Sequence, residues 1–273
     1  MRACVTILLA LGLGCSSQVR ELIVANGDSG VCRVSIGAAP CQVISRMPDP
    51  DLQIIDGAGD DFCGVGALVF EARNAAATSP SPAPDLPEQV TLRVAWSPGY
   101  FHSHVHVSDA NVIPSTGDVL WDGDAIEYFV APPSTSGYDG SYSTGADRGP
   151  RQIVLSPPGP DKPARGAVYL DYVITGQVTT LPAEYFAGRL VSDGYELELR
   201  LPWGSVTDPP ASGKRIAFDF AIDVQDGADA GQRQLQGTIN QTFVDGSELC
   251  GLASGQAAWP ACDTRTWCQP ALE

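Results

Sequence analysis

The sequence is poor in basic residues, and this shortage limits the partners that the protein can have. Lysine and arginine together number 16, against 32 aspartates and glutamates, so the 273-residue chain has a formal net charge of −16. An electrostatic field of that sign repels phosphate backbones and anionic lipid surfaces. We therefore expect no nucleic-acid partner, although plain solubility outside the cell would also account for the acidity.

Long apolar runs are lacking too. The most apolar stretch, residues 5–13, is too short for a membrane span, which needs about 20 apolar residues, but it fits the apolar region of a secretory signal. The small residue before Cys15 resembles the lipobox of bacterial lipoproteins. We predict a lipoprotein-type signal peptide at 1–15, lipidation at Cys15 and a place in the cell envelope, at the outer membrane. An ordinary cleaved signal would instead give a secreted or periplasmic protein, and an uncleaved anchor is the third alternative.

Common catalytic motifs are also missing. The chain has no Gly-x-Ser-x-Gly elbow, no phosphate-binding loop and no His-Glu-x-x-His helix. Glu196 and Glu198 stand two residues apart on one predicted strand face that we expect to be exposed, which makes them a poor acid and base pair for glycoside hydrolysis. We predict that the protein is not an enzyme.

Cysteine, in contrast, is plentiful, with eight residues. Two of them fall within the predicted signal peptide, which leaves an even set of six: Cys32, Cys41, Cys63, Cys250, Cys262 and Cys268. In an exported chain such a set predicts disulfides, here three, and the sequence leaves all 15 possible pairings open. A zinc site is the competing interpretation, but the spacings do not match paired Cys-x-x-Cys knuckles.

Short segments with alternating apolar and polar residues recur along the chain, separated by many of its 29 glycines and 22 prolines. Alternation with period two is typical of half-buried strands, and we find no helical stripe over 12 residues. The segment 195–201, for example, places Tyr195 and Leu197 on one face and Glu196 on the other. The predicted strands are 90–96, 101–107, 125–130, 152–155, 167–174, 195–201, 216–224 and 233–239. The pattern predicts an all-β fold, an antiparallel β-sandwich of jelly-roll or immunoglobulin-like type, stapled by disulfides.

The domain organisation follows from these segments. After the signal peptide we predict a cysteine-containing N-terminal segment at 16–47, and then one β-sandwich with a cysteine-rich C-terminal tail at 48–273. Two stretches rich in turn residues, 75–89 and 132–150, are predicted to be surface loops.

Four phrases of the sequence occur in a characteristic order. They are Ile54–Asp61, Leu92–Trp96 followed by Phe101–Asp109, Leu120–Val130, and Asp193–Trp203 leading into residues 216–226. Together they resemble the family 9 carbohydrate-binding modules and their wider superfamily, over about residues 50 to 245. The resemblance implies a β-sandwich that binds sugars, as an accessory domain of a glycosidase or as a free surface protein.

The resemblance also implies site residues. The tryptophan and the glutamate of the third phrase would be Trp121, stacking on a sugar ring, and Glu127, binding its hydroxyl groups. An indole beside a carboxylate suits a sugar, because a sugar ring has apolar C–H faces and polar hydroxyl groups. A purely structural role at the start of a strand is the alternative for both residues.

Further along, Gln152 matches the family pattern, but the usual arginine and asparagine fall on Val154 and Ser156. Replacing an arginine by valine removes charge-assisted hydrogen bonds to the ligand, so the site would bind differently, more weakly or not at all. For the second stacking tryptophan of the family, Trp259 and Trp267 are the candidates, although packing around a disulfide would also explain Trp267.

Two patterns suggest metal ions. His102, His104 and His106 alternate on one predicted strand, so their imidazoles share a face and could bind zinc or copper; a solvated or ligand-facing row is the alternative. Oxygen-rich turns could hold a structural calcium ion, or could be plain turn formers, at 56–61, 122–124 and 223–229. We expect no required cofactor.

The sequence thus predicts non-catalytic binding of an oligosaccharide or polysaccharide by an exported, lipid-anchored domain whose only link to the membrane is its anchor. One rival is a structural envelope lipoprotein that keeps the sandwich and has a degenerate sugar site. The other is a metal-binding or haem-binding domain of the same superfamily. Because only Met1 and Met47 are present, a haem would need histidine ligands.

Overall fold

The computed structural model describes only part of the chain. The described residues are 20–26, 30–36, 43–72, 77–79, 88–131, 151–171, 177–205, 211–227, 233–239 and 270–273. In the strands at 20–26, 30–36 and 77–79 only the backbone is described. The predicted signal peptide with Cys15, the loop at 132–150, and Trp259 and Trp267 lie outside the described residues. Within them, no helix has the length and apolar character needed to cross a membrane.

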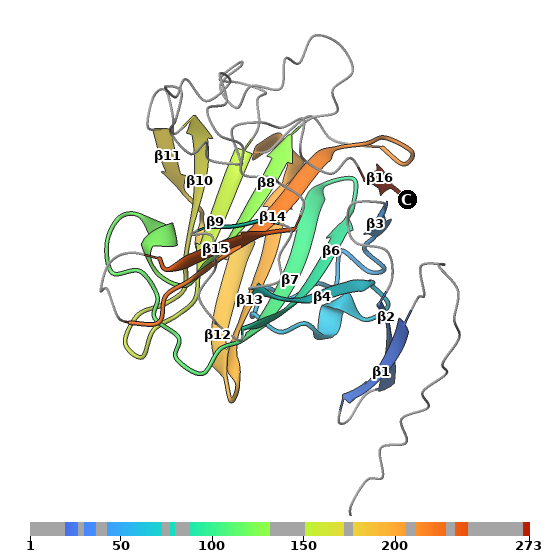
Figure 1. Cartoon of the computed structure of the whole chain (residues 1–273). Helices are drawn as coiled ribbons and strands as arrows, with labels where there is room; N and C mark the ends of the chain where they lie inside the picture. The colour runs from blue at the N-terminus through green and yellow to red at the C-terminus, as the bar shows by residue number, and fades with distance from the viewer. Residues whose placement is uncertain are drawn as a thin grey trace, which may run out of the picture.

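The described chain is built almost entirely of strands, which form two seven-stranded sheets (Figure 1). The first sheet has the order β11 (Gln177–Thr180), β10 (Arg165–Asp171), β9 (Arg151–Ser156), β8 (Ala125–Ala131), β14 (Ala217–Val224), β15 (Leu235–Thr238), β5 (Ala77–Ser79). The second has the order β12 (Phe186–Val191), β13 (Gly194–Pro202), β7 (Tyr100–Ser108), β6 (Gln89–Trp96), β3 (Val43–Arg46), β16 (Ala271–Leu272), and β4 (Ala67–Glu71) also pairs with β6.

A few short elements complete the described structure. Strands β1 (Arg20–Asn26) and β2 (Gly30–Ile36) pair with each other in a small sheet of their own. The helical turns are η1 (Asp60–Phe62), η3 (Leu120–Asp122), η4 (Ala183–Tyr185) and η5 (Trp203–Ser205). Each of the eight predicted strands coincides with an observed one to within a few residues, and the all-β prediction is confirmed.

One edge of the second sheet joins distant parts of the sequence. β3 pairs in parallel with β6 and, on its other side, with β16. The indole N–H of Trp96 donates a hydrogen bond to the carbonyl of Glu273, 2.9 Å away. The sandwich therefore includes residues 43–46, which lie ahead of the predicted domain boundary at residue 48.

The core lies between the two sheets and is made by alternate residues of their strands. The predicted inward faces are confirmed, because Tyr195 and Leu197 are fully buried in the core cluster. At its centre, the Phe101 ring contacts the rings of Tyr128, Trp203 and Phe218, with centroids 5.8, 5.8 and 6.0 Å away. Side chains from both sheets thus interlock around one aromatic residue.

Truncating that central ring tests the core. We expect Phe101→Ala to lower the free energy of unfolding by about 3–5 kcal/mol, because it removes buried apolar surface and leaves a cavity. Leu52→Ala is the control, since Leu52 is 72% exposed and its truncation should change stability by no more than about 0.5 kcal/mol. Urea unfolding followed by fluorescence measures both, and similar midpoints for the two variants would contradict the packing described.

Candidate functional site

The outer face of the first sheet, which points away from the core, carries most of the predicted sugar-binding residues. The strand register places the following side chains on it: Ala125, Glu127, Phe129, Gln152, Val154, Ser156, Ala167, Tyr169, Asp219, Ala221, Asp223, Gln236 and Thr238. Cross-strand partners share a face of a sheet, so strands β10, β9, β8, β14 and β15 all contribute to it. Trp121 belongs to the helical turn η3, which leads into β8.

Glu127 lies at the centre of this face and is fully buried. Its Oε2 accepts a hydrogen bond from the side-chain amide of Gln152. Its Oε1 accepts one from the amide of Gln236 at 2.8 Å and one from Nη1 of Arg233 at 3.2 Å. The resemblance implied that Glu127 binds hydroxyl groups, but the structure turns its carboxylate towards neighbouring side chains. We call Glu127, Gln152, Asp223, Arg233 and Gln236 the Glu127 network.

Arg233 connects two buried carboxylates. The same Nη1 that contacts Glu127 lies 2.9 Å from Oδ1 of Asp223. Burial raises the pKa of Asp223 well above its ordinary value and the charge of Glu127 adds to this, whereas Arg233 opposes it. For Arg233 itself burial disfavours the charge, but the two carboxylates outweigh it and the pKa is raised. The guanidinium is therefore a permanent cation.

Trp121 is partly buried, beside this network. It packs on a small apolar cluster formed by Leu120, Ala125, Val154, Ala167 and Tyr169. Its ring centroid lies 4.7 Å from that of Tyr169. Val154 stands opposite Glu127 in the β8–β9 register, so the indole and the carboxylate share a neighbour. The aromatic ring and the polar network thus adjoin on one face.

The two departures from the family pattern have structural roles here. Val154 is fully buried beneath Trp121, where its aliphatic side chain supports the indole. Ser156 is buried, and its hydroxyl donates a hydrogen bond to the carbonyl of Asp124 at 3.2 Å. Strand β9 therefore contributes packing at these two positions, and the cation of the site comes from Arg233 instead.

Asp124 fixes the loops around η3. Its Oδ1 accepts the backbone N–H of Gln225 at 2.7 Å, and its Oδ2 accepts that of Ile113. Burial raises the pKa of Asp124 to about 8, with Asp109 adding to the rise and the two backbone bonds opposing it. The preceding Gly123 has no space for a side chain, because a Cβ there would lie 2.1 Å from the nitrogen of Ser115. These contacts hold the turn that carries Trp121.

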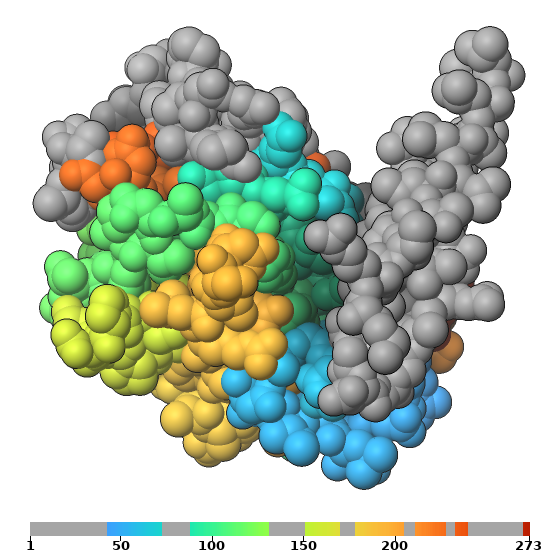
Figure 2. Space-filling view, turned by 90° about the horizontal axis from the view of Figure 1, so that it is seen from below, coloured from blue at the N-terminus to red at the C-terminus, as the bar shows by residue number. Residues whose placement is uncertain are grey.

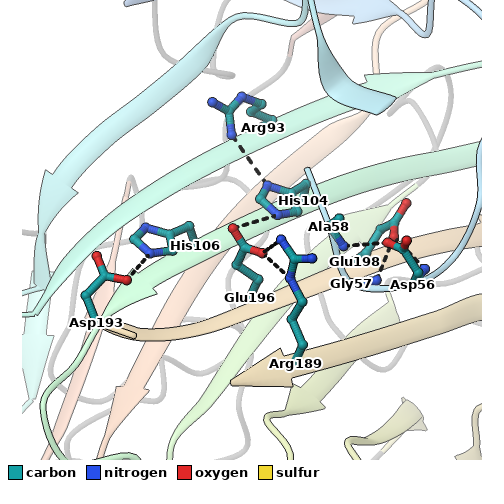
Figure 3. Close-up of polar contacts among 10 residues, drawn as sticks. All are labelled: Asp56, Gly57, Ala58, Arg93, His104, His106, Arg189, Asp193, Glu196 and Glu198. Carbon is teal, nitrogen blue, oxygen red and sulfur yellow. Dashed lines mark hydrogen bonds and ion pairs between the residues drawn. The ribbon is translucent and has the colours of Figure 1, made fainter. Parts of the chain in front are cut away.

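A second polar cluster covers the outer face of the second sheet (Figure 3). His104 lies between Arg93, whose Nη1 is 3.4 Å from its Nδ1, and Glu196, 3.9 Å from its Nε2. His106 lies 3.3 Å from Asp193. His102 is hydrogen-bonded to Ser97 at 2.8 Å and to Gln53 at 2.6 Å. The three imidazoles share a face, as predicted, but each has its own partners.

The histidine face is not exposed. His102 and His104 are almost completely buried, and only His106 is partly exposed. Burial lowers the pKa of His102 to about 4, with Arg200 contributing. Burial also lowers that of His104 to about 3, with Arg93 contributing. Both imidazoles are therefore neutral at pH 7.

The segment Gln53–Gly59, which we call the strap, covers these residues. Glu198 Oε1 accepts a hydrogen bond from the amide of Gln53 at 2.8 Å, and its Oε2 accepts the backbone N–H groups of Asp56 at 3.1 Å and Gly57 at 3.0 Å. The expectation that Glu198 is exposed is therefore wrong. Burial beneath the strap raises its pKa to about 7, although these hydrogen bonds lower it. Figure 2 shows the strap, in blue, against the gold β12 and β13.

Two glycines let the strap lie this close to the sheet. Gly57 has a φ of +87°, and a Cβ on it would approach the backbone of Gly188 and Arg189 to 3.3 Å. A Cβ on Gly59 would lie 2.5 Å from the ring of His104. Larger residues would lift the strap from the histidines.

No group of three or more His, Cys, Asp or Glu side chains in the described residues could hold a metal ion. The structure thus gives no support to a site at His102, His104 and His106. In the oxygen-rich turns, aspartates bind their own backbone: Asp56 accepts the N–H of Ala58 and Asp61 that of Ile54, both at 2.8 Å. Calcium binding at the oxygen-rich turns stays a prediction.

Several predictions stay untested. The lipidation site Cys15 and the tryptophans Trp259 and Trp267 lie outside the described residues. Of the six cysteines predicted to form disulfides, only Cys63 has a described side chain.

The sequence interpretation also missed Arg233 and Gln236 as members of the site. Alternation in β14 did place Asp223 on the face away from the core.

The two sheets form a β-sandwich, and the outer face of the first sheet carries a polar network beside a partly exposed indole. No family model matches the sequence, and no curated protein matches it closely enough to count as a relative. A family 9 carbohydrate-binding module from Caldicellulosiruptor kristjanssonii, in complex with cellotriose, is similar in structure, with a TM-score of 0.54, 16% identity and coverage of 85% of this chain and 93% of that one. A module of the same description in complex with glucose has a TM-score of 0.52 and 16% identity, and the match covers 85% of this chain and 94% of that one. The chain thus has the fold of the family 9 modules, as its resemblance implied.

The buried His104 makes stability depend on pH. Its pKa of about 3 in the folded protein lies below the ordinary 6.5, so the unfolded chain binds more protons as the pH falls from 6.5. Because of His104, the free energy of unfolding therefore falls by up to about 1.4 kcal/mol for each pH unit of acidification. Glu198 acts in the opposite direction, because its raised pKa adds stability below pH 4.5 that is lost as the pH rises through about 7. We expect His104→Gln to lose stability less steeply than the wild type between pH 6.5 and 4.

Chemical unfolding at a series of pH values measures this difference in slope. His106→Gln is the matched control, because it removes a partly exposed imidazole from the same strand. Parallel pH profiles for wild type and His104→Gln would show that His104 does not remain neutral in the folded protein.

Proposed function

We propose that the protein binds carbohydrate at the outer face of its first sheet and catalyses no reaction. The observation that carries this proposal is the position of the partly exposed Trp121 beside the Glu127 network. An indole packs against the apolar C–H face of a sugar ring, and sugar hydroxyl groups both donate and accept hydrogen bonds. The structural neighbours in complex with cellotriose and glucose support neutral glucose-based sugars as the first ligands to test.

Stacking on one aromatic ring and a few hydrogen bonds give weak, reversible binding to a single sugar chain. Repeated ligands on a polysaccharide would raise the effective affinity through avidity, if several copies of the protein are held on one surface. Such a site suits attachment to a polymer better than capture of a scarce small molecule.

The same geometry speaks against glycoside hydrolysis. A glycosidase needs two carboxyl groups that can reach opposite sides of the scissile bond. Glu127 and Asp223 are both fully buried and share one nitrogen of Arg233. Neither is placed to protonate a leaving group or to attack a sugar carbon, so we assign them to the support of a binding site.

The location of the protein is part of the proposal. The apolar run at 5–13 and the small residue before Cys15 support export with a lipid anchor at Cys15. The even set of six cysteines supports three disulfides in an oxidising compartment. Anchored in this way at the cell envelope, the sandwich would present its sugar-binding face to polysaccharides.

One observation favours a second candidate, a structural envelope lipoprotein with a degenerate site. Gln152 and Glu127 are both fully buried, and Val154 and Ser156 serve packing. If the Glu127 network only stabilises the sheet, the sandwich keeps its shape and binds no sugar. Direct binding measurements separate the two functions.

Removal of the indole is the test. We expect Trp121→Ala to weaken binding of cellotriose at least about tenfold, equivalent to about 1.4 kcal/mol, and to lower stability by no more than about 1–2 kcal/mol. Isothermal titration calorimetry and thermal unfolding measure the two effects. Tyr100→Ala is the matched control, because Tyr100 is a partly exposed aromatic residue on the second sheet, stacked with Arg200 at 5.4 Å. Equal binding by wild type and Trp121→Ala would exclude this site.

A further inference from the structure

Arg233 is the member of the Glu127 network that reaches solvent. Its side chain is 27% exposed, whereas those of Glu127 and Asp223 are completely buried. Gln152 and Gln236 are buried as well. A ligand approaching this face from solvent would therefore meet the guanidinium before any other group of the network.

The guanidinium uses only a fraction of its hydrogen-bonding capacity within the protein. A guanidinium has five N–H donors in a planar fork. Nη1 makes both ion-pair contacts of Arg233, to Glu127 and to Asp223. Among the described residues Nη2 and Nε have no partner, so the outer part of the fork is available to bind an oxygen atom.

Three oxygen atoms of the Glu127 network are buried acceptors. Oε1 of Gln152, Oε1 of Gln236 and Oδ2 of Asp223 are buried and have no hydrogen-bond partner among the described residues. A buried polar atom is normally paired, because leaving it without a hydrogen bond is unfavourable. These oxygens are sealed from solvent, so within the Glu127 network only the exposed edge of Arg233 can meet a ligand.

We infer that Arg233 is the ligand-contacting donor of this face and binds hydroxyl oxygens of a neutral sugar through Nη2 and Nε. The inference rests on the proposed function and names the residue that selects the ligand. Glu127 and Asp223 hold the fork in place through Nη1, and Gln152 and Gln236 hold Glu127. The arginine that the family pattern places on β9 is replaced by Val154, and Arg233 supplies a cation from the segment that leads into β15.

The charges around Arg233 select against acidic sugars. Its positive charge is already balanced by the buried Glu127, with Asp223 also in contact, and Asp122 adds a further negative charge nearby. A carboxylate or sulfate on the ligand would meet an excess of negative charge on a chain whose net charge is −16. The ligand class is therefore a neutral, hydroxyl-rich sugar.

Calorimetric titrations of the full chain with glucose, cellotriose and glucuronate test this inference. Arg233→Gln removes the charge, and Arg233→Lys keeps the charge beside Glu127 and Asp223 but removes the fork. We expect at least about tenfold weaker binding of cellotriose for Arg233→Gln, since a hydrogen bond to a charged donor is lost, and a loss of several fold for Arg233→Lys. Arg189→Gln is the matched control, because Arg189 is a more exposed arginine paired with Glu196 on the second sheet.

The outcomes separate this inference from the proposed function. If Trp121→Ala weakens binding and both Arg233 variants bind like the wild type, Arg233 does not contact the ligand, while sugar binding stands. If the wild type binds neither glucose nor cellotriose, the proposed function fails and the inference fails with it. Binding of glucuronate as tightly as glucose would overturn the assignment to neutral sugars. Circular dichroism confirms folding, and if Arg233→Gln does not fold, Arg233→Lys decides the question.

Discussion

The structure depends on the burial of both faces of strand β8. Ile126 and Tyr128 point into the core, and Glu127, between them, points to the outer face, yet all three are fully buried. A buried carboxylate is costly unless it is paired and hydrogen-bonded. Arg233, Gln152 and Gln236 meet that requirement. The adjacent strand β9, strand β15 on the far side of β14, and the segment before β15 are thus arranged around one carboxyl group.

The second sheet also buries polar groups on its outer face, but a different part of the chain supplies their hydrogen bonds. Its outer face buries Glu198 and two histidines, but the strap closes over them with backbone N–H groups and the side chain of Gln53. The imidazoles stay neutral, and the cover consists of the protein's own backbone. On the outer face of the first sheet, Trp121 and Arg233 are partly exposed to solvent. We therefore place the functional site there and not among the histidines.

Sequence periodicity was sufficient for the strands and for the direction of each side chain. It placed Tyr195 and Leu197 in the core and the three histidines on one face, whereas Trp121 and Glu127 were identified through the family resemblance. It could not show what covers a face. Gln53, which buries Glu198, lies 145 residues away in sequence, and Arg233 lies 106 residues from Glu127. Alternation within a strand carries no information about such distant partners, so Glu198 was wrongly predicted to be exposed.

The pairing of β16 with β3 has a consequence for biosynthesis. β3 and β6 are among the early strands of the sandwich, yet among the described residues the far edge of β3 is covered by residues 271–272 alone. Until the ribosome has released those residues, β3 presents an unpaired edge, the kind of surface that recruits other chains. The second sheet therefore cannot be completed before residues 271–272 have been synthesised, and a chain truncated ahead of them would leave the edge of β3 open to pairing with other chains.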